Sequence, residues 1–81
     1  MIIEEKGTTY EIMMGSDVQR DGMYLELSIP NTNPLRQIAE VFYSDQTHDF
    51  VVSCFEENVP MELIELLIEN AKNRLPINDD T

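Results

Sequence analysis

Residues 59–75, VPMELIELLIENAKNRL, are the most informative part of the sequence for the fold, because they are the one stretch whose apolar residues recur with the period of a helix. Val59 precedes a proline and is biased away from helical angles, whereas Pro60 suits the first helical position. Pro76 makes Leu75 the expected last residue, so the helix should contain about fifteen residues. One arc of this predicted amphipathic helix is apolar and consists of Met61, Leu63, Ile64, Leu67, Ile68, Ala71 and Leu75.

The chain before this helix reads as strands separated by turns. Two segments, 8–14 and 23–29, alternate apolar and polar side chains, which is typical of strands with one covered face. Two later segments, 36–44 and 49–55, carry apolar side chains on both parities, which is typical of strands covered on both faces. Residues 2–5 form either a hairpin with the segment 8–14 or the beginning of one longer strand.

Three to five antiparallel strands followed by one helix predict a two-layer α+β domain with a meander-like sheet. The domain should occupy residues 1–75, followed by a polar tail over residues 76–81. A single helix is narrower than such a sheet, so it can cover only one face. The covered face should take Tyr10, Ile12 and Met14 from one strand and Met23, Leu25, Leu27 and Ile29 from the next.

The composition is strongly acidic, with 16 Asp and Glu against 5 Lys and Arg, a net charge of −11 on 81 residues. Phosphates are neutralised by Lys and Arg, so we expect neither nucleic acid nor a membrane as a partner. A basic protein surface or a second copy of the chain fits this charge better. The one cysteine, Cys54, cannot form an internal disulfide, which favours a reducing compartment such as the cytoplasm.

The uncovered face of the sheet is the predicted binding surface. It should collect carboxylates from neighbouring strands and some of Ile38, Phe42, Val51 and Phe55. Like charges on adjacent strands repel and exposed rings favour contact, so a partner that supplies cations and covers the rings would relieve both. In the alternative interpretation, the carboxylates are staggered on a solvated face and do not meet. The predicted partner-binding residues are Glu11, Tyr24, Glu26, Glu40, Phe42 and Leu66, the last from the polar side of the helix.

No pattern in the sequence predicts catalysis. Cys54 and His48 are the one thiol and the one imidazole, and the strand parity of Cys54 points inward, where burial disfavours the thiolate. Three glycines leave no glycine-rich phosphate loop. His48 lies between Asp45 and Asp49, but this spacing matches no established metal loop. We therefore expect a non-enzyme without a cofactor or a metal.

Two functions are compatible with these features. The first is a small acidic protein-binding module of a microbial cell, such as an immunity- or antitoxin-like inhibitor whose carboxylates mimic phosphates and block a basic effector. The second is a structural homodimer or assembly subunit that associates through the uncovered sheet face or through Leu63 and Leu66. A metal-binding enzyme built on Asp45, His48 and Asp49 is a third reading, and it would need ordered metal beside these side chains.

Overall fold

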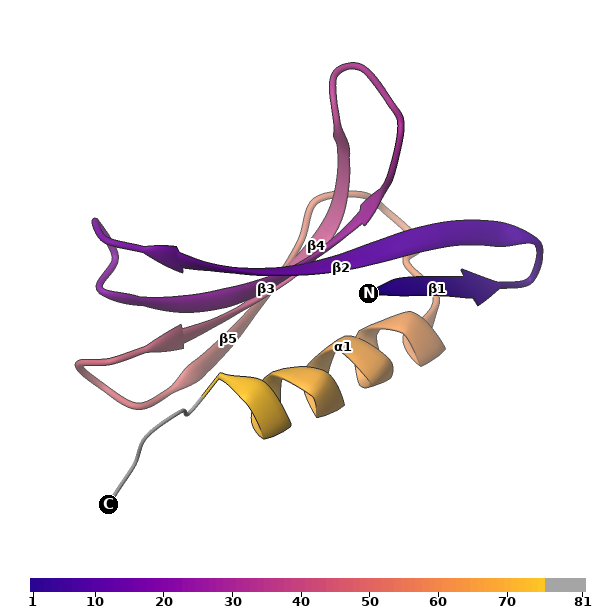
Figure 1. Cartoon of the computed structure of the whole chain (residues 1–81). Helices are drawn as coiled ribbons and strands as arrows, with labels where there is room; N and C mark the ends of the chain where they lie inside the picture. Colours follow the sequence, from indigo (N-terminus) through magenta and orange to yellow (C-terminus); the bar gives the residue numbers. More distant parts are fainter. Residues whose placement is uncertain (76–81) are drawn as a thin grey trace.

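The computed structural model describes residues 1–75, and the tail predicted for residues 76–81 lies outside the described part. Within residues 1–75, five strands precede one helix, and α1 lies across one face of the twisted sheet (Figure 1). The sheet is an antiparallel meander in the order β1-β2-β3-β4-β5. The predicted two-layer α+β architecture is confirmed. The elements are β1 (Ile2–Glu5), β2 (Thr8–Asp17), β3 (Gly22–Ile29), β4 (Arg36–Ser44), β5 (Phe50–Cys54) and α1 (Met61–Arg74).

The first two strands form a hairpin, with Ile3 opposite Tyr10. The sequence left this open against one longer strand. β2 is longer than predicted, since Gly15 to Asp17 continue the ladder with β3 where we expected a loop. These three residues have little apolar periodicity, so only their pairing with the neighbouring strand makes them part of the sheet. The turn that remains contains Asp21 at a positive φ of 58°, a conformation that aspartate tolerates in tight turns.

The core lies between α1 and the middle strands β3 and β4. Leu63, Leu67 and Ala71 form the buried stripe of the helix. Met61 was predicted to belong to this stripe but is 70% exposed. It lies about 120° around the helix from Leu67, the middle residue of the stripe, at 100° per residue. The buried core cluster consists of Ile12, Leu25, Leu27, Ile38, Ala39, Val41, Leu63, Leu67, Ala71 and Leu75.

A bulge in β4 changes which residues reach this core. Leu27 pairs with Ala39 and Ser28 pairs with Gln37, so Ile38 has no partner on β3. The extra residue of a bulge bends the strand and redirects side chains. Ile38 and Ala39 are 4% and 0% exposed and both join the core. The expectation that Ile38 could belong to the uncovered face is therefore wrong.

The edges of the sheet extend beyond the helix. Met14, predicted on the covered face, is 44% exposed on β2. On the other side, β5 lies outside the strands that α1 packs against, and Val52 is 42% exposed although its parity matches the core residue Val41. Cys54 is likewise exposed, which corrects its predicted burial. Because β5 carries apolar residues on both parities, the sequence predicted that both of its faces would be covered. In the structure, side chains on both faces of β5 are exposed.

Candidate functional site

We call the sheet face turned away from α1 the outer face. Side chains alternate along a strand, so the neighbours of the buried residues Leu25, Leu27 and Val41 point away from the helix. Cross-strand pairing then brings residues from four strands together on this face. The outer face carries Glu11, Met13, Tyr24, Glu26, Glu40, Phe42 and Val51.

Most of the residues predicted to contact a partner share this face. Leu66 is the exception, because it is half-buried on α1 and lies in the other layer. Leu63, the other leucine considered for self-association, is 1% exposed and belongs to the core, so it offers no contact surface. The predicted residues that the fold does bring to the outer face are Glu11, Tyr24, Glu26, Glu40 and Phe42.

Two carboxylates of the outer face are placed directly opposite each other. Glu26 on β3 pairs with Glu40 on β4, so the staggered arrangement considered for these acids is wrong for this pair. Partial burial, and then the charge of Glu40, raise the pKa of Glu26 above its usual range, while the side-chain amide of Gln37 donates to Glu26 and acts in the other direction. The charged form of Glu26 is thus disfavoured where it stands.

Arg20 belongs to this candidate site, although the sequence analysis did not identify it. It comes from the turn between β2 and β3 and folds over the outer face. Its Nη1 and Nη2 donate to Glu40 Oε1 and Oε2 at 3.1 and 2.8 Å, and its Nε donates to Asp17 Oδ2 at 2.5 Å. Hydrogen bonds from Arg20 lower the pKa of Asp17, and the two carboxylates raise the pKa of the guanidinium. The chain therefore supplies its own cation to one carboxylate of the opposed pair.

The same guanidinium covers one of the two predicted aromatic anchors. Arg20 Cζ lies 4.1 Å from the centroid of the Phe42 ring, and Phe42 is only 8% exposed although it points away from the helix. The ring also lies against β3 at Gly22, where an added Cβ would come within 2.5 Å of Phe42 Cζ. Phe42 is thus covered by the chain itself and is not a free contact residue.

The Tyr24 ring also packs against a glycine, which leaves room for it because it has no side chain. The ring lies across Gly15 of β2, where an added Cβ would come within 2.4 Å of the Tyr24 hydroxyl oxygen. Glycine in a strand often marks such a close approach. Tyr24 remains half-buried. Met13 on the adjacent strand β2 is 48% exposed, and Val51 on β5, across Phe42 from Tyr24, is 52% exposed. The accessible part of the outer face is therefore centred on Tyr24 and Glu26.

Elsewhere in residues 1–75, the side chains that could bind a metal or act in catalysis are not grouped together. In residues 1–75, no three His, Cys, Asp or Glu side chains are grouped as a metal would require. The His48 ring stacks on Tyr43 with a centroid distance of 6.2 Å, and Tyr43 contacts Phe50. His48 and Cys54 flank opposite ends of β5, roughly 20 Å apart at the rise of a strand, so they cannot act as a base and a nucleophile on one substrate.

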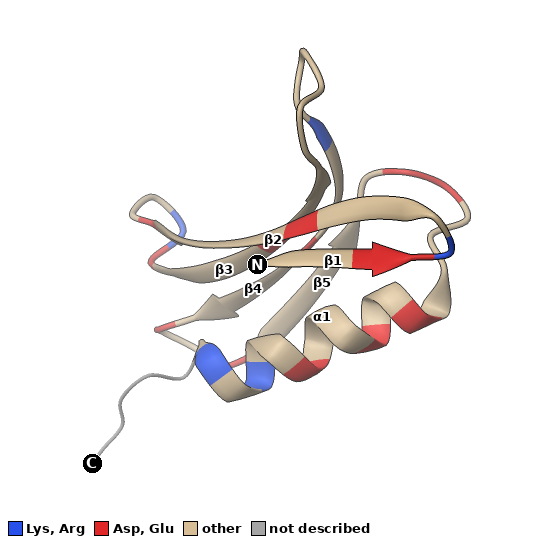
Figure 2. Cartoon of the chain, turned by 45° about the vertical axis from the view of Figure 1, so that its right-hand side comes forward, with Lys and Arg blue, Asp and Glu red and all other residues tan. Residues whose placement is uncertain are grey.

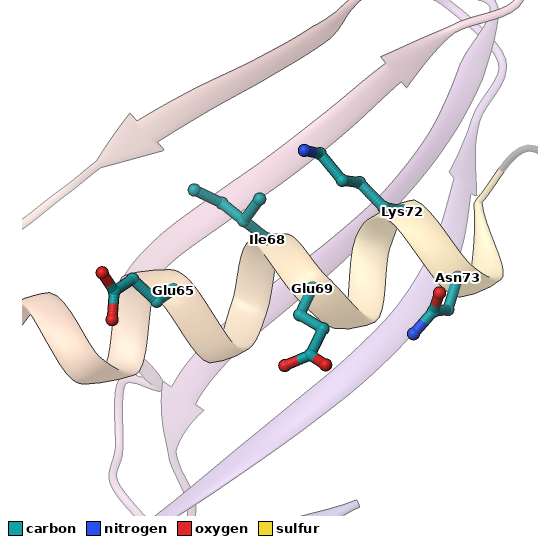
Figure 3. Close-up of a pocket in the computed structure, with 5 residues that line it drawn as sticks. All are labelled: Glu65, Ile68, Glu69, Lys72 and Asn73. Carbon is teal, nitrogen blue, oxygen red and sulfur yellow. The ribbon is translucent and has the colours of Figure 1, made fainter.

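Two hollows lie on the side of the molecule that holds α1. One, of about 350 Å³, is lined by helix residues alone, and their polar ends diverge (Figure 3). The other, of about 260 Å³, lies near the start of the helix beside an ion pair in which Arg36 Nε donates to Glu56 Oε2 at 2.6 Å. Neither brings a nucleophile and a base together. The residues that line the first are Glu65, Ile68, Glu69, Lys72 and Asn73.

Comparisons of the chain with protein-family models, with curated proteins and with solved structures find no match. In the described residues, no helix has the length and apolar character needed to cross a membrane.

Proposed function

We propose that the chain is a small, non-enzymatic, acidic module that binds a basic protein through the accessible part of its outer face. The observation that carries this proposal is the opposed pair Glu26 and Glu40, of which Arg20 neutralises only Glu40. Glu26 is left partly buried beside a like charge, with no Lys or Arg donor among the described residues. A lysine or arginine from a partner would stabilise its charged form.

The surroundings of Glu26 support such a contact. Tyr24 offers an amphipathic ring, Met13 offers exposed apolar surface on the adjacent strand β2, and Val51 extends this surface beyond Phe42 on β5. Aromatic residues anchor interfaces, and charge complementarity speeds encounter and selects the partner. A net charge of −11 favours association with a strongly basic protein. We propose that an immunity- or antitoxin-like inhibitor of a cytoplasmic basic effector, such as a nuclease, is the role that this surface fits.

The experiment compares two charge reversals of equal size on different faces. Glu26→Lys changes the outer face, whereas Glu69→Lys changes an exposed residue of α1 and is the matched control. Immobilised wild-type and variant proteins are tested for capture of purified basic nucleases at 50 and 500 mM NaCl, with inhibition of cleavage as the second measurement.

We expect capture and inhibition by the wild type and by Glu69→Lys at low salt, weakening at high salt, and loss of both with Glu26→Lys. Equal loss with the two variants would mean that only the total charge matters and would refute a defined surface. Circular dichroism of each variant separates lost binding from lost folding.

A further inference from the structure

The two edges of the sheet are protected very differently. β1 has only four residues, and its last two are the carboxylates Glu4 and Glu5, which oppose pairing with another strand. β5 is the other edge and contains no charged residue, no proline and no bulge from Phe50 to Cys54. Short length, charge, proline and bulges are the usual protections of an edge strand, and β5 has only the first.

The pairing of β5 with β4 fixes which backbone groups are free. At one end of the β4–β5 ladder, Ser44 N donates to Asp49 O at 3.0 Å, and at the other end Phe55 N donates to Ile38 O at 2.8 Å. On the β5 side, both bonds are therefore made by odd-numbered residues, Asp49 and Phe55. In an antiparallel pair every second residue bonds to the neighbouring strand. The N–H and C=O groups of Phe50, Val52 and Cys54 therefore point away from β4 into the open edge.

The side chains of the same three residues lack a cover. They share the face of Ala39, Val41 and Tyr43, which is the face that carries α1. Because the helix packs on β3 and β4, Phe50 and Val52 remain 37% and 42% exposed. Among residues 1–75, the edge thus offers backbone donors and acceptors without a partner strand, together with apolar side chains on one short segment.

We propose that two copies of the chain associate by antiparallel pairing of β5 with β5, which forms one ten-stranded sheet around a two-fold axis at Val52. The outward-pointing groups belong to even-numbered residues, so only even-numbered residues can bond across the axis. In the register centred on Val52, Phe50 of one copy faces Cys54 of the other, and Val52 faces Val52. This register uses every free group of the three residues and makes six hydrogen bonds.

The charges flanking the edge also favour this register. Each chain is strongly acidic, so contact between two copies requires a segment without like charges in opposition. With Val52 on the axis, Asp49 lies opposite Phe55 and Glu56 lies opposite His48, so no two carboxylates face each other. A shift by one residue would place Asp49 opposite Glu56 and would misalign the free backbone groups. The two-fold axis is perpendicular to the sheet, so both helices lie on one side and both outer faces on the other.

This association does not depend on the basic partner proposed for the outer face, and salt separates the two. Screening weakens attraction to a basic protein but reduces repulsion between two acidic copies. A five-residue strand pair is smaller than a standard interface of about 800 Å² per partner, so we expect a dissociation constant in the micromolar range, on the order of 10–100 μM.

The first test is sedimentation equilibrium from 5 to 500 μM protein at 50 and 500 mM NaCl. We expect the mass to rise from 9.4 kDa toward twice that value and to rise at lower concentration in high salt. Val52→Lys should abolish the rise, because it places two ammonium groups at the axis, while Val18→Lys, at an 89% exposed position of the β2–β3 turn, should leave it unchanged. A wild type that stays monomeric in both salts, or a Val52→Lys variant that still dimerises, would overturn the proposal.

The second test reads the register through the native thiol. Phe50→Cys should place a new thiol opposite Cys54 of the other copy, at about 5.5 Å between Cα atoms, which suits a disulfide. Oxidised glutathione accepts the two electrons and two protons of each new bond. We expect a covalent dimer from Phe50→Cys and not from Val51→Cys, which the register places opposite Ser53. Equal crosslinking of both variants would overturn the register and with it the symmetry proposed here.

Discussion

Arg20 joins groups that are far apart in the sequence, since its guanidinium contacts the carboxylates of Asp17 and Glu40 and the ring of Phe42. A bidentate pair is favoured by the planar guanidinium, which also packs on an aromatic face. At the residue scale this one side chain decides how much of the outer face is accessible, because it covers Phe42 and leaves Glu26 without a basic partner in the described chain.

Removing Arg20 should therefore weaken the fold. We expect Arg20→Ala to lower the free energy of unfolding by about 1 kcal/mol, the sum of an exposed ion pair and a cation–π contact. Arg20→Lys should recover less than half of the loss, because an ammonium cannot bond Glu40 through two parallel donors while lying flat on Phe42. Urea denaturation followed by circular dichroism measures both. Full recovery by lysine would mean that charge alone matters at this position.

Glu26 gives a prediction about pH. Its folded pKa is raised above the unfolded value of about 4.5, so the folded state binds the proton more tightly, and the stability that this provides is present at low pH. It is lost as the pH rises from the unfolded pKa through the folded one. We expect Glu26→Gln to be more stable than the wild type at pH 7, by on the order of 0.5 kcal/mol after solvent screening.

The same comparison at acid pH provides the control. Below the ordinary carboxyl range the wild-type Glu26 is protonated in both states, so the advantage of Glu26→Gln should disappear there. Glu69→Gln removes the same formal charge at an exposed helix position, so it is the control for the change in net charge, and the stabilisation should be larger with Glu26→Gln. Melting temperatures between pH 3 and 8 provide the measurement, and a Glu26→Gln variant less stable than the wild type at pH 7 would contradict the prediction.

At the element scale, the three central strands are held close by two glycines with different neighbours. A Cβ at Gly22 would lie 2.1 Å from the backbone oxygen of Tyr43, which is part of the β3–β4 ladder and cannot withdraw alone. A Cβ at Gly15 would meet the far end of the Tyr24 ring, which can rotate away. Substitution by alanine therefore tests a backbone contact that cannot move at Gly22 and a side-chain contact that can move at Gly15.

We expect Gly22→Ala to lower the free energy of unfolding by on the order of 3 kcal/mol, as for an overpacked interior site, and Gly15→Ala by about 1 kcal/mol or less. Chemical denaturation measures the two losses, and tyrosine fluorescence reports whether Tyr24 moves in the second variant. Equal losses would show that the backbone contact at Gly22 can relax as easily as a side chain does.

At the scale of the whole molecule, acidic residues lie on β1, on the loop before α1 and along most of the helix, while basic residues are few and scattered (Figure 2). Lys72 and Arg74 lie in the last turn of α1, where they complement the helix dipole. Among the described residues, Arg20 and Arg36 form ion pairs with carboxylates. Most of the acids in residues 1–75 therefore take no part in an ion pair, and their mutual repulsion opposes the compact state.

Salt should consequently stabilise the protein. We expect the melting temperature to rise by several degrees between 10 and 500 mM NaCl, because screening of the excess negative charge outweighs the weakening of exposed ion pairs. Sodium chloride is preferred to sulfate, which also strengthens apolar burial by exclusion. A sucrose series at matched osmolarity is the control. A flat or falling response to chloride would contradict net repulsion among the acids.

The order of the elements can be read from the sequence alone, since alternation along a strand and the helical period are local properties of a chain. The sequence also indicated the outer face, because Glu11, Tyr24, Glu26, Glu40 and Phe42 have the parity that leaves them opposite the helix. Three features became visible in the folded chain and not in the sequence: the register that opposes Glu26 to Glu40, the bulge that moves Ile38 inward, and the bond from Arg20 to a carboxylate twenty positions away. The same holds for the position of the helix, which covers β3 and β4 and leaves β5 exposed. This packing depends on contacts between segments far apart in the chain, and the local periodicity of the sequence does not predict such contacts.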